Sequence, residues 1–280
     1  MERAQFDCDG FYIFRNVLDL GLLERLREAS DASLAEQDEQ HFVEQVATGS
    51  MILVDGAFIE RYPVFADFIV YPPILQALAR LGFPDPRFGH GRVISKPPHS
   101  PPLFWHEDGR FWDDPVSYTP VPIQAFLMCY LTDTTPENGC LRVVPGSHLK
   151  RHALHDLVPE THTDGNRKYL DVEDNPAFAH YDDEVDVPLR AGDFVVGYGS
   201  LFHAAHGNDS DTRRTCLTMW YYPAFPDLPE RTQASVAAVE RGLQFSPDAP
   251  PELTDRLRPL EISYTGDAEP IPTNWVCGLR

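Results

Sequence analysis

Two segments of the chain carry histidines and a carboxylate at spacings that suit a metal site. His106 and Asp108 stand two residues apart, just after Phe104 and Trp105. In a strand, residues two apart point to the same face, so these two side chains would converge with Phe104 beside them. A neutral imidazole and a carboxylate are two of the three groups in the facial triad that binds Fe(II) and leaves three coordination positions open. The third ligand would come from the distant segment 201–210, which contains His203 and His206.

The His-x-Asp pattern is weak evidence by itself, because this chain is rich in both residue types. With 11 His and 26 Asp among 280 residues, about one such pair is expected by chance. Three pairs occur, and two of them lie in the polar segment 150–190 with no apolar strand around them. We expect neither of those two to be a ligand pair; they are His162/Asp164 and His180/Asp182.

An arginine downstream of His203 gives the first pair a chemical context. Arg214 lies eleven positions after His203, at the head of the apolar run 215–220. The planar guanidinium group pairs a carboxylate through two parallel hydrogen bonds, which suits an anionic co-substrate held beside a metal. The neighbouring Arg213 is the alternative for this role.

Composition and charge exclude several classes of protein. The chain is 42% hydrophobic and 24% charged, which is enough apolar material for a full-sized core. A formal net charge of −20 repels phosphate backbones and anionic lipids, so we expect no nucleic-acid partner and no membrane partner. No apolar run approaches the ~20 residues of a spanning helix, and no signal peptide is evident. The five cysteines are scattered without a Cys-x-x-Cys pair, which disfavours a cysteine metal site and fits the reducing cytoplasm.

Hydrophobic patterning predicts β-strands in the middle of the chain and helices on both sides. We predict an opening strand over 11–14, a helix after Asp19, a helix over 73–81 ended by Gly82, and a helix over 229–240. From about residue 88 to 224, short apolar runs alternate with Pro, Gly and Asp, which is typical of a β-sandwich or jelly roll. The expected strands are Arg92–Ser95, Leu103–Trp105, Ile123–Leu131, Leu141–Val144, Phe194–Tyr198 and Cys216–Tyr222.

These elements are expected to form one domain over residues 1–280. It would have a helical N-terminal part over about 1–87, a jelly-roll core over about 88–224 and a C-terminal extension over 225–280. The polar segment 150–190 is interpreted as a long insertion or a lid.

Three blocks of this sequence resemble the phytanoyl-CoA dioxygenase family of Fe(II)/2-oxoglutarate-dependent oxygenases. The first is Trp105–Asp108, the second is Glu137–His148, and the third is His203-x4-Asn208-x-Ser210-x3-Arg214. The blocks follow one another in the family's order, and the resemblance covers roughly residues 5–224. The fold that it implies is an all-β core, a cupin-like double-stranded β-helix (jelly roll) with flanking α-helices.

The resemblance also implies the roles of individual residues. It assigns His106, Asp108 and His203 to iron, and Arg214 to the distal carboxylate of 2-oxoglutarate. His206 then becomes a supporting or surface residue, since only His203 has Asn, Ser and Arg at the required distances. His148 is interpreted as a structural turn residue.

The cofactors implied are Fe(II), the co-substrate 2-oxoglutarate and O2. The 2-oxo acid would take two of the three open positions and O2 the last, with succinate and CO2 as co-products. Gln124 and Met128 are expected beside the 2-oxoglutarate; in some relatives an aromatic residue stands near the position of Met128. Related halogenases have a small residue where this chain has Asp108, so halogenation is disfavoured.

We expect hydroxylation of a C–H bond in a small metabolite or natural-product intermediate by a cytoplasmic monomer or homodimer. Desaturation, epoxidation or ring formation at the same iron is the alternative. A cupin-like metal-binding module without 2-oxoglutarate chemistry, and a non-catalytic jelly-roll binding module, are alternatives from other classes. The residues expected to contact the substrate are Lys96, Phe104, Arg110, Trp112 and Trp220.

Overall fold

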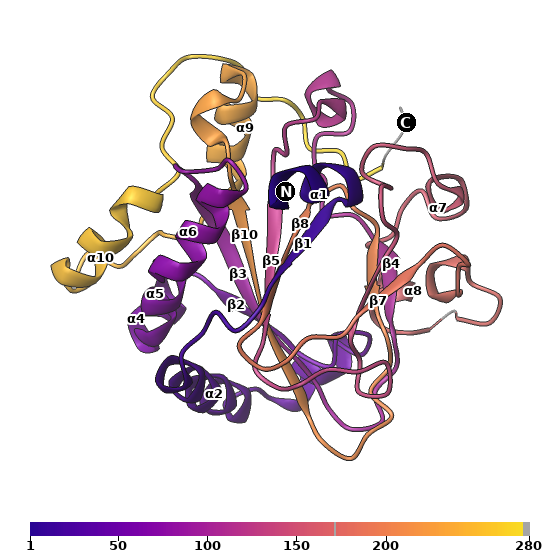
Figure 1. Ribbon diagram of the computed structural model, residues 1–280. Coiled ribbons are helices and arrows are strands. Elements are labelled where there is room, and N and C mark those ends of the chain that lie inside the picture. The colour runs from indigo at the N-terminus through magenta and orange to yellow at the C-terminus, as the bar shows by residue number, and fades with distance from the viewer. Residues whose placement is uncertain (171, 277–280) are drawn as a thin grey trace.

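Two antiparallel β-sheets face each other in the computed structural model, which describes residues 1–170 and 172–276 (Figure 1). The major sheet has the order β1 (Phe11–Phe14), β8 (Phe194–Tyr198), β5 (Ala125–Tyr130), β10 (Arg214–Tyr222), β3 (Arg87–Lys96) and β2 (Met51–Val54). The minor sheet has the order β4 (Leu103–His106), β9 (His203–Ala205), β6 (Leu141–Val143) and β7 (Val185–Val187). This arrangement confirms the predicted jelly-roll class.

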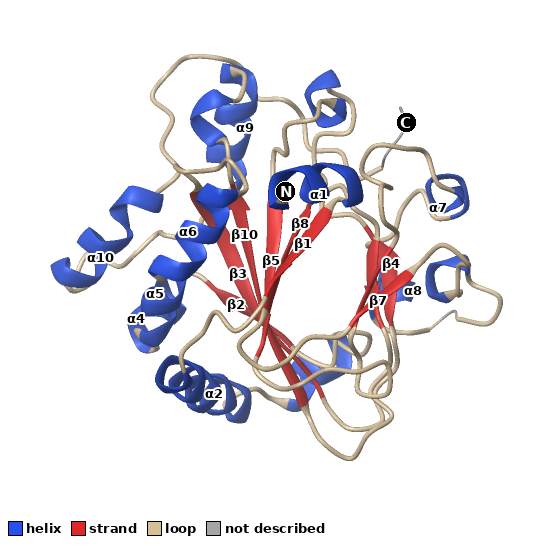
Figure 2. Cartoon of the chain, in the orientation of Figure 1, coloured by secondary structure: helices blue, strands red, loops and turns tan. Residues whose placement is uncertain are grey.

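Helices surround the two sheets (Figure 2). Those before the first long strand are α1 (Glu2–Asp9), α2 (Leu20–Ala35), α3 (Glu39–Glu44), α4 (Gly56–Arg61), α5 (Val64–Ile69) and α6 (Pro72–Arg80). Those after it are α7 (Ala153–Leu157), α8 (Asp164–Arg167), α9 (Glu230–Val239) and α10 (Pro251–Leu257). Four short 3-10 turns are η1 (Pro115–Tyr118), η2 (Pro176–Phe178), η3 (Phe225–Asp227) and η4 (Arg258–Leu260). Among the described residues, no helix combines the length and the apolar character needed to cross a membrane.

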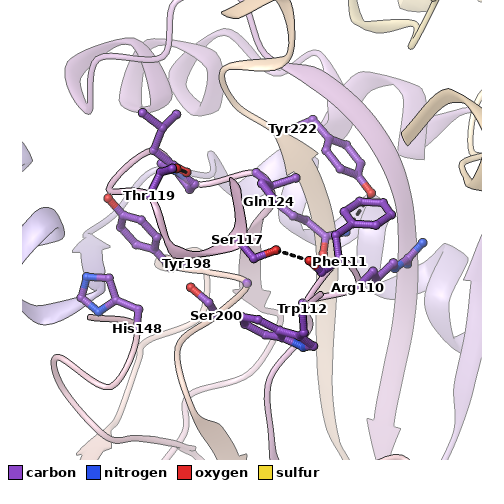
Figure 3. Close-up of a pocket in the computed structure, with 15 residues that line it drawn as sticks. Arg110, Phe111, Trp112, Ser117, Thr119, Gln124, His148, Tyr198, Ser200 and Tyr222 are labelled. Atoms are coloured by element: carbon purple, nitrogen blue, oxygen red, sulfur yellow. Dashed lines mark hydrogen bonds between the residues drawn. The ribbon is translucent and has the colours of Figure 1, made fainter. Parts of the chain in front are cut away.

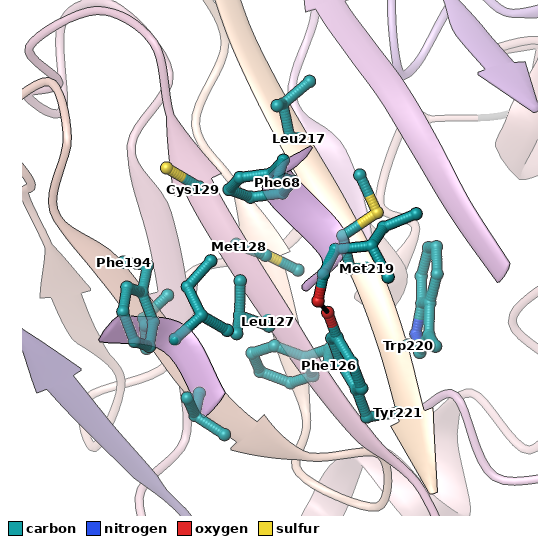
Figure 4. Packing of buried hydrophobic residues seen from close by; sticks show 14 of the residues in the cluster. Phe68, Phe126, Leu127, Met128, Cys129, Phe194, Leu217, Met219, Trp220 and Tyr221 are labelled. Carbon is teal, nitrogen blue, oxygen red and sulfur yellow. Dashed lines mark hydrogen bonds between the residues drawn. The ribbon is translucent and has the colours of Figure 1, made fainter. Parts of the chain in front are cut away.

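The side chains of strand β10 alternate between the helix-covered face of the major sheet and its inner face. Figure 4 shows Phe68 of α5 beside Leu217, with Met219 and Tyr221 further along the same strand. The Tyr221 hydroxyl donates a hydrogen bond to the Ile69 carbonyl at 3.0 Å, which ties the strand to the helices. Because side chains alternate along a strand, the intervening residues of β10 point toward the minor sheet.

The N-terminal part is more closely joined to the core than the boundary near residue 87 suggests. Its strands β1 and β2 form the two edges of the major sheet. The Asp19 carboxylate accepts a hydrogen bond from the Leu22 amide and caps α2, as expected of an N-cap aspartate. Gly82 follows the end of α6 in the left-handed region, with φ 86°, as the sequence predicts for the end of that helix.

The segment 150–190 packs against the outer face of the minor sheet. Leu154 of α7 joins a buried cluster with Trp105 of β4, and with Phe202 and Ala204 at β9. The Trp105 indole N–H also donates to the Ala179 carbonyl at 2.9 Å. This segment therefore covers the sheet that carries the predicted histidine ligands.

The pairing of β4 with β9 places His106 directly opposite His203. Leu103 pairs with Ala205, so between the two pairs Phe104 and Trp105 of β4 correspond to Ala204 alone, and the ladder is irregular there. Such a bulge bends the strand and changes where its side chains point. Residues opposite one another in an antiparallel pair share a face, so both imidazoles point into the space between the sheets.

Gly197 keeps room for an aromatic ring that supports this pair. Phe126 is opposite Gly197 across β5 and β8, and its ring lies 4.6 Å from the His203 ring. A Cβ on Gly197 would lie 2.1 Å from the Phe126 ring. We expect Gly197→Ala to lower the free energy of unfolding by about 1–3 kcal/mol, because the core is overpacked there; urea unfolding measures it.

The control is Gly165→Ala, where the nearest atom would lie at an ordinary 3.8 Å from the new Cβ. Equal stability of the two variants would contradict the role given to Gly197.

Candidate metal centre

Three side chains converge between the two sheets. His106, Asp108 and His203 offer ligand atoms that all lie within 4.8 Å of one another. The Asp108 carboxylate oxygens lie 4.0 Å from His106 Nε2 and 3.7 Å from His203 Nε2. Two atoms bound about 2.1 Å from one metal ion are about 3–4 Å apart, so this spacing suits a shared ion.

Both imidazoles are fixed by the backbone. His106 Nδ1 donates to the Phe104 carbonyl at 3.0 Å, and His203 Nδ1 donates to the Leu201 carbonyl at 2.9 Å. A carbonyl oxygen only accepts, so each Nδ1 carries the proton and each Nε2 presents a lone pair. This is the tautomer that binds metals through Nε2.

The charges at this centre call for a cation. Burial lowers the pKa of His106 to about 4 and also lowers the pKa of His203, so both rings are neutral. Burial alone would raise the pKa of Asp108, but the two histidines and a hydrogen bond from Trp220 lower it overall. His203 Nε2 is buried and has no hydrogen-bond partner. Two lone pairs and a carboxylate thus face one point, which an Fe(II)-like ion would satisfy.

A chain of contacts holds Asp108 in place. The Trp220 indole N–H donates to Asp108 Oδ2 at 2.6 Å, and the Asp108 amide donates to the Gly199 carbonyl at 2.6 Å. The Trp220 ring stacks on His90 with centroids 4.7 Å apart. His90 Nδ1 lies 2.8 Å from Glu240 Oε2, so a residue of the C-terminal extension holds the other end of this series of contacts.

A cavity of about 430 Å³ opens beside the three convergent side chains. Its walls come from both sheets and from the segments that close over them. The lining residues from the strands and the adjoining loops are Met51, His90, Arg92, Ile94, Leu103, Phe104, His106, Asp108, Arg110, Gln124, Met128, His203, Thr218 and Trp220. Those from other segments are Gln45, Ala47, Thr48, Glu160, His162, Arg167 and Trp275.

His162 is a cavity residue that the sequence reasoning missed. Its ring lies 5.3 Å from the His106 ring and 5.5 Å from the Trp275 ring. Burial, and to a lesser extent the nearby His106, lowers the pKa of His162 to about 4. The Asp164 side chain is 77% exposed and pairs with Lys168, so the pair His162/Asp164 does not converge. The only sequence signal was a histidine in a long polar insertion.

Arg214 is buried on the inner side of β10, at one end of the space between the sheets. Its Nε has no hydrogen-bond partner, and its guanidinium carbon lies 5.3 Å from the Tyr130 ring centre. Arg213 is instead exposed and donates to the Ser95 carbonyl at 3.2 Å. Gly139, with φ 89°, passes so close that a Cβ there would lie 3.3 Å from Arg214 Nη2. The second sequence block therefore makes room for this arginine.

Asn208 shapes the turn that leads to Arg214. Its side-chain amide donates to the Pro97 carbonyl at 3.0 Å and to the Thr212 carbonyl at 2.8 Å. The Ser210 hydroxyl donates to Asn208 Oδ1 at 2.7 Å. The fixed spacing of the third block thus reflects a hydrogen-bonded turn.

Four of the remaining predicted site residues line the cavity and two do not. Phe104, Arg110, Gln124 and Met128 are on its wall. Lys96 is not among the described lining residues, because its ammonium group donates to the carbonyls of Ala47 and Pro101.

Trp112 lies in an adjoining pocket of about 40 Å³, where it packs against Gly109 (Figure 3). The sequence expectation that Lys96 and Trp112 face the open side of the metal is therefore not met. His206 pairs with Asp186 at 2.6 Å on the minor sheet, and its Nε2 is not part of the convergent group.

The model of one protein family matches most of the chain. The family is phytanoyl-CoA dioxygenase (PhyH), and the match covers residues 6–216. Phytanoyl-CoA dioxygenase 1 of rice is 29% identical over 170 residues, which are 59% of this chain and 55% of the rice protein. Dioxygenase trt7 of Aspergillus terreus is 27% identical over 231 residues, covering 77% of this chain and 70% of its own. The chain thus spans about half of the first relative's length.

Solved structures share the fold at low identity. The epimerase SnoN, in complex with Fe3+, alpha ketoglutarate and nogalamycin RO, has a TM-score of 0.59 and 21% identity, covering 89% of this chain and 95% of its own. EctD from S. alaskensis, with 2-oxoglutarate and 5-hydroxyectoine, has a TM-score of 0.56 and 20% identity. The match covers 79% of this chain and 74% of the EctD chain.

The hydrogen bond from Trp220 to Asp108 provides a test of the centre. Trp220→Phe keeps a ring against His90 but removes the donor to the carboxylate. We expect affinity for a divalent ion such as Co(II) to fall roughly 10–100-fold, because the carboxylate is no longer held; titration calorimetry measures it.

Tyr221→Phe is the matched control, since it removes a hydrogen bond from the opposite face of the same strand. If both variants bind Co(II) as the wild type does, Trp220 has no part in holding the ligand.

Proposed function

Because this chain belongs to the phytanoyl-CoA dioxygenase family, we propose that it is an Fe(II)/2-oxoglutarate-dependent dioxygenase that hydroxylates a C–H bond of a small organic molecule. The observation that carries the proposal is the convergence of His106, Asp108 and His203 at the wall of a cavity between the two sheets. Three protein ligands leave open positions on an iron ion, and the cavity provides the space in which co-substrate and substrate meet it.

Each group has a defined task in this proposal. His106 and His203 hold the ion through Nε2, and Asp108 holds it through its carboxylate. When bound, iron with 2-oxoglutarate and O2 supplies oxidative decarboxylation, in which one oxygen atom goes to the C–H bond and the other to succinate, with CO2 released. Arg214 pairs with the distal carboxylate of 2-oxoglutarate, and Met128 and Gln124 flank the space beside the metal.

The cavity walls orient the substrate and keep water out. Phe104, Trp220 and Trp275 provide aromatic surfaces around the space next to the three ligands. His162 and Trp275 close it from segments outside the two sheets, with rings 5.5 Å apart. A largely apolar cavity of about 430 Å³ suits a compact small molecule. The solved structures bound to nogalamycin RO and 5-hydroxyectoine support a small metabolite or natural-product intermediate as substrate.

Anaerobic addition of Fe(II) and 2-oxoglutarate tests the centre directly. The wild type is expected to show a weak visible charge-transfer band, and His106→Ala is expected to lose it because one of three ligands is missing. In air, the wild type should release succinate, and the variant should not. A band of full strength in His106→Ala would refute the ligand assignment.

Variants of two adjacent arginines, one buried and one exposed, test whether Arg214 binds the co-substrate. Arg214→Met is expected to raise the KM for 2-oxoglutarate by two orders of magnitude or more, since a buried charge partner is lost. Arg213→Met is the control and should leave that KM unchanged, because Arg213 is exposed. Succinate assays over a range of 2-oxoglutarate concentrations measure both values; succinate release that does not need 2-oxoglutarate would point to a metalloenzyme of another class.

The mass of the organic product distinguishes insertion of oxygen, by hydroxylation or epoxidation, from desaturation and ring formation. Hydroxylation and epoxidation add one oxygen atom, whereas desaturation and ring formation by C–C or C–O closure remove two hydrogens. Mass spectrometry after incubation with 18O2 is expected to show one labelled oxygen in the product. Loss of two hydrogens without label would move the proposal to desaturation or ring closure at the same iron.

A further inference from the structure

Arg92 is a partly buried cation on the cavity wall. It lies on β3, opposite Thr218 of β10, and both residues line the cavity. Its Nη1 is buried and has no hydrogen-bond partner. The charges of Asp55 and Glu240 act on Arg92, but among residues 1–170 and 172–276 neither carboxylate forms an ion pair with it within 4.0 Å. Leaving a buried N–H donor of a guanidinium group unpaired is costly, so its position suits an anion that enters the cavity.

Glu240, one of the two carboxylates whose charge acts on Arg92, already has other partners. Glu240 Oε1 accepts hydrogen bonds from Arg110 Nη1 at 2.8 Å and from the Tyr222 hydroxyl at 2.6 Å. Glu240 Oε2 lies 2.8 Å from His90 Nδ1. Burial would raise the pKa of Glu240, but its partners His90 and Arg110 lower it to about 2, so it stays ionised. Its oxygens are thus taken by Arg110, Tyr222 and His90, and Glu240 acts on Arg92 only through its charge, without a direct contact.

Arg110 adds a second donor next to Arg92. Its Nε is also buried without a hydrogen-bond partner, and its guanidinium group lies 5.2 Å from the Trp275 ring centre. Arg92 and Arg110 line the same cavity, and burial and the charge of Arg110 lower the pKa of Arg92, against the opposing effect of Asp55 and Glu240. Two neighbouring guanidinium groups with free N–H donors form a site for a carboxylate.

The charge of Arg92 is separate from the charge of Arg214, which 2-oxoglutarate would meet. Arg92 pairs with Thr218, four residues along β10 from Arg214, which corresponds to about 13 Å of strand. Iron, Asp108 and Arg214 together balance the two negative charges of 2-oxoglutarate. The other charged residues of the wall, Glu160 and Arg167, have opposite signs. Arg92 is therefore a wall cation, apart from Arg214, that carries a buried N–H donor without an acceptor.

The surroundings of Arg92 also define the rest of the ligand. Met51, Ile94 and Phe104 line the same cavity, and Trp275 lies over Arg110. An anion that reaches Arg92 thus brings an apolar body against these walls. We propose that Arg92, assisted by Arg110, binds a carboxylate carried by the substrate, so that the substrate is a small organic acid with an apolar body. The assignment rests on the proposed function, since it identifies the substrate of that same iron site.

Matched pairs of acids and amides test this assignment. The probes are a set of monoaryl carboxylic acids, each compared with its primary amide, which has the same shape without the charge. They are added to the anaerobic Fe(II)–2-oxoglutarate complex, and the shift in Tm is measured. The acids are expected to stabilise the wild type more than their amides do. In Arg92→Met, acid affinity should fall on the order of tenfold or more, to the level of the amides.

Two further variants control for folding and for general charge. Arg92→Lys keeps the positive charge and should retain part of the preference for acids. Arg87→Met removes an arginine from the same strand, where it pairs with Asp85 away from this cavity, and should keep the full preference. Equal Tm shifts from acids and amides in the wild type, or a preference for acids that survives in Arg92→Met, would overturn the proposal.

The charge-transfer band separates this proposal from the proposed function. Arg92→Met is expected to bind 2-oxoglutarate with the affinity of the wild type; a tenfold loss would assign Arg92 to the co-substrate instead and overturn the proposal. If the wild type forms no band, the proposed function fails. The comparison of acids and amides on the metal-free protein then decides the carboxylate site by itself.

Discussion

The pairing of β4 with β9 is the constraint on which the rest of the site depends. It places His106 opposite His203, and the backbone carbonyls of Phe104 and Leu201 fix the two rings so that their Nε2 lone pairs face inward. Two neutral imidazoles and a carboxylate at this separation repel one another or leave buried acceptors unsatisfied, unless a cation joins them. The Phe126 ring on one side and the indole N–H of Trp220 on the other hold the three side chains in this arrangement.

The protein combines an acidic exterior with a cationic interior. Its formal net charge is −20, yet Arg92, Arg110 and Arg214 are largely withdrawn from solvent around the space between the sheets. Inside a low-dielectric cavity these charges act at short range and are weakly screened, whereas the surface charges are screened by salt within about 10 Å. The exterior therefore reduces nonspecific association with polyanions, while the interior still attracts small anions.

Local patterns were enough to predict the class of fold and the pair His106 and Asp108, whereas the choice of His203 over His206 depended on the family resemblance. The period-two spacing of His106 and Asp108 survives in the structure although Asp108 lies just past the end of β4. Strand β1 and the Asp19 cap were also predictable, because both depend on a few consecutive residues. Arg213 and Arg214 are adjacent in the sequence, and only the family's spacing favoured the second.

The cavity walls were harder to predict because they come from segments that are distant in sequence. His162, Glu240 and Trp275 lie in loops or in the C-terminal extension, where no periodic pattern reports which side chain turns inward. Lys96 and Trp112 looked like substrate contacts from their proximity to the motif, but hydrogen bonds and packing turn them elsewhere.

The position of Trp275 has a consequence for how this enzyme can diversify. The family's shared pattern ends at residue 216, yet this ring closes the cavity against His162 and Arg110. Trp275 thus lines the cavity from outside the residues that match the family, whereas His106, Asp108 and His203 lie inside them. Changes around Trp275 would therefore reshape one wall of the cavity while leaving in place the three convergent side chains and the contacts from Glu240 that support them.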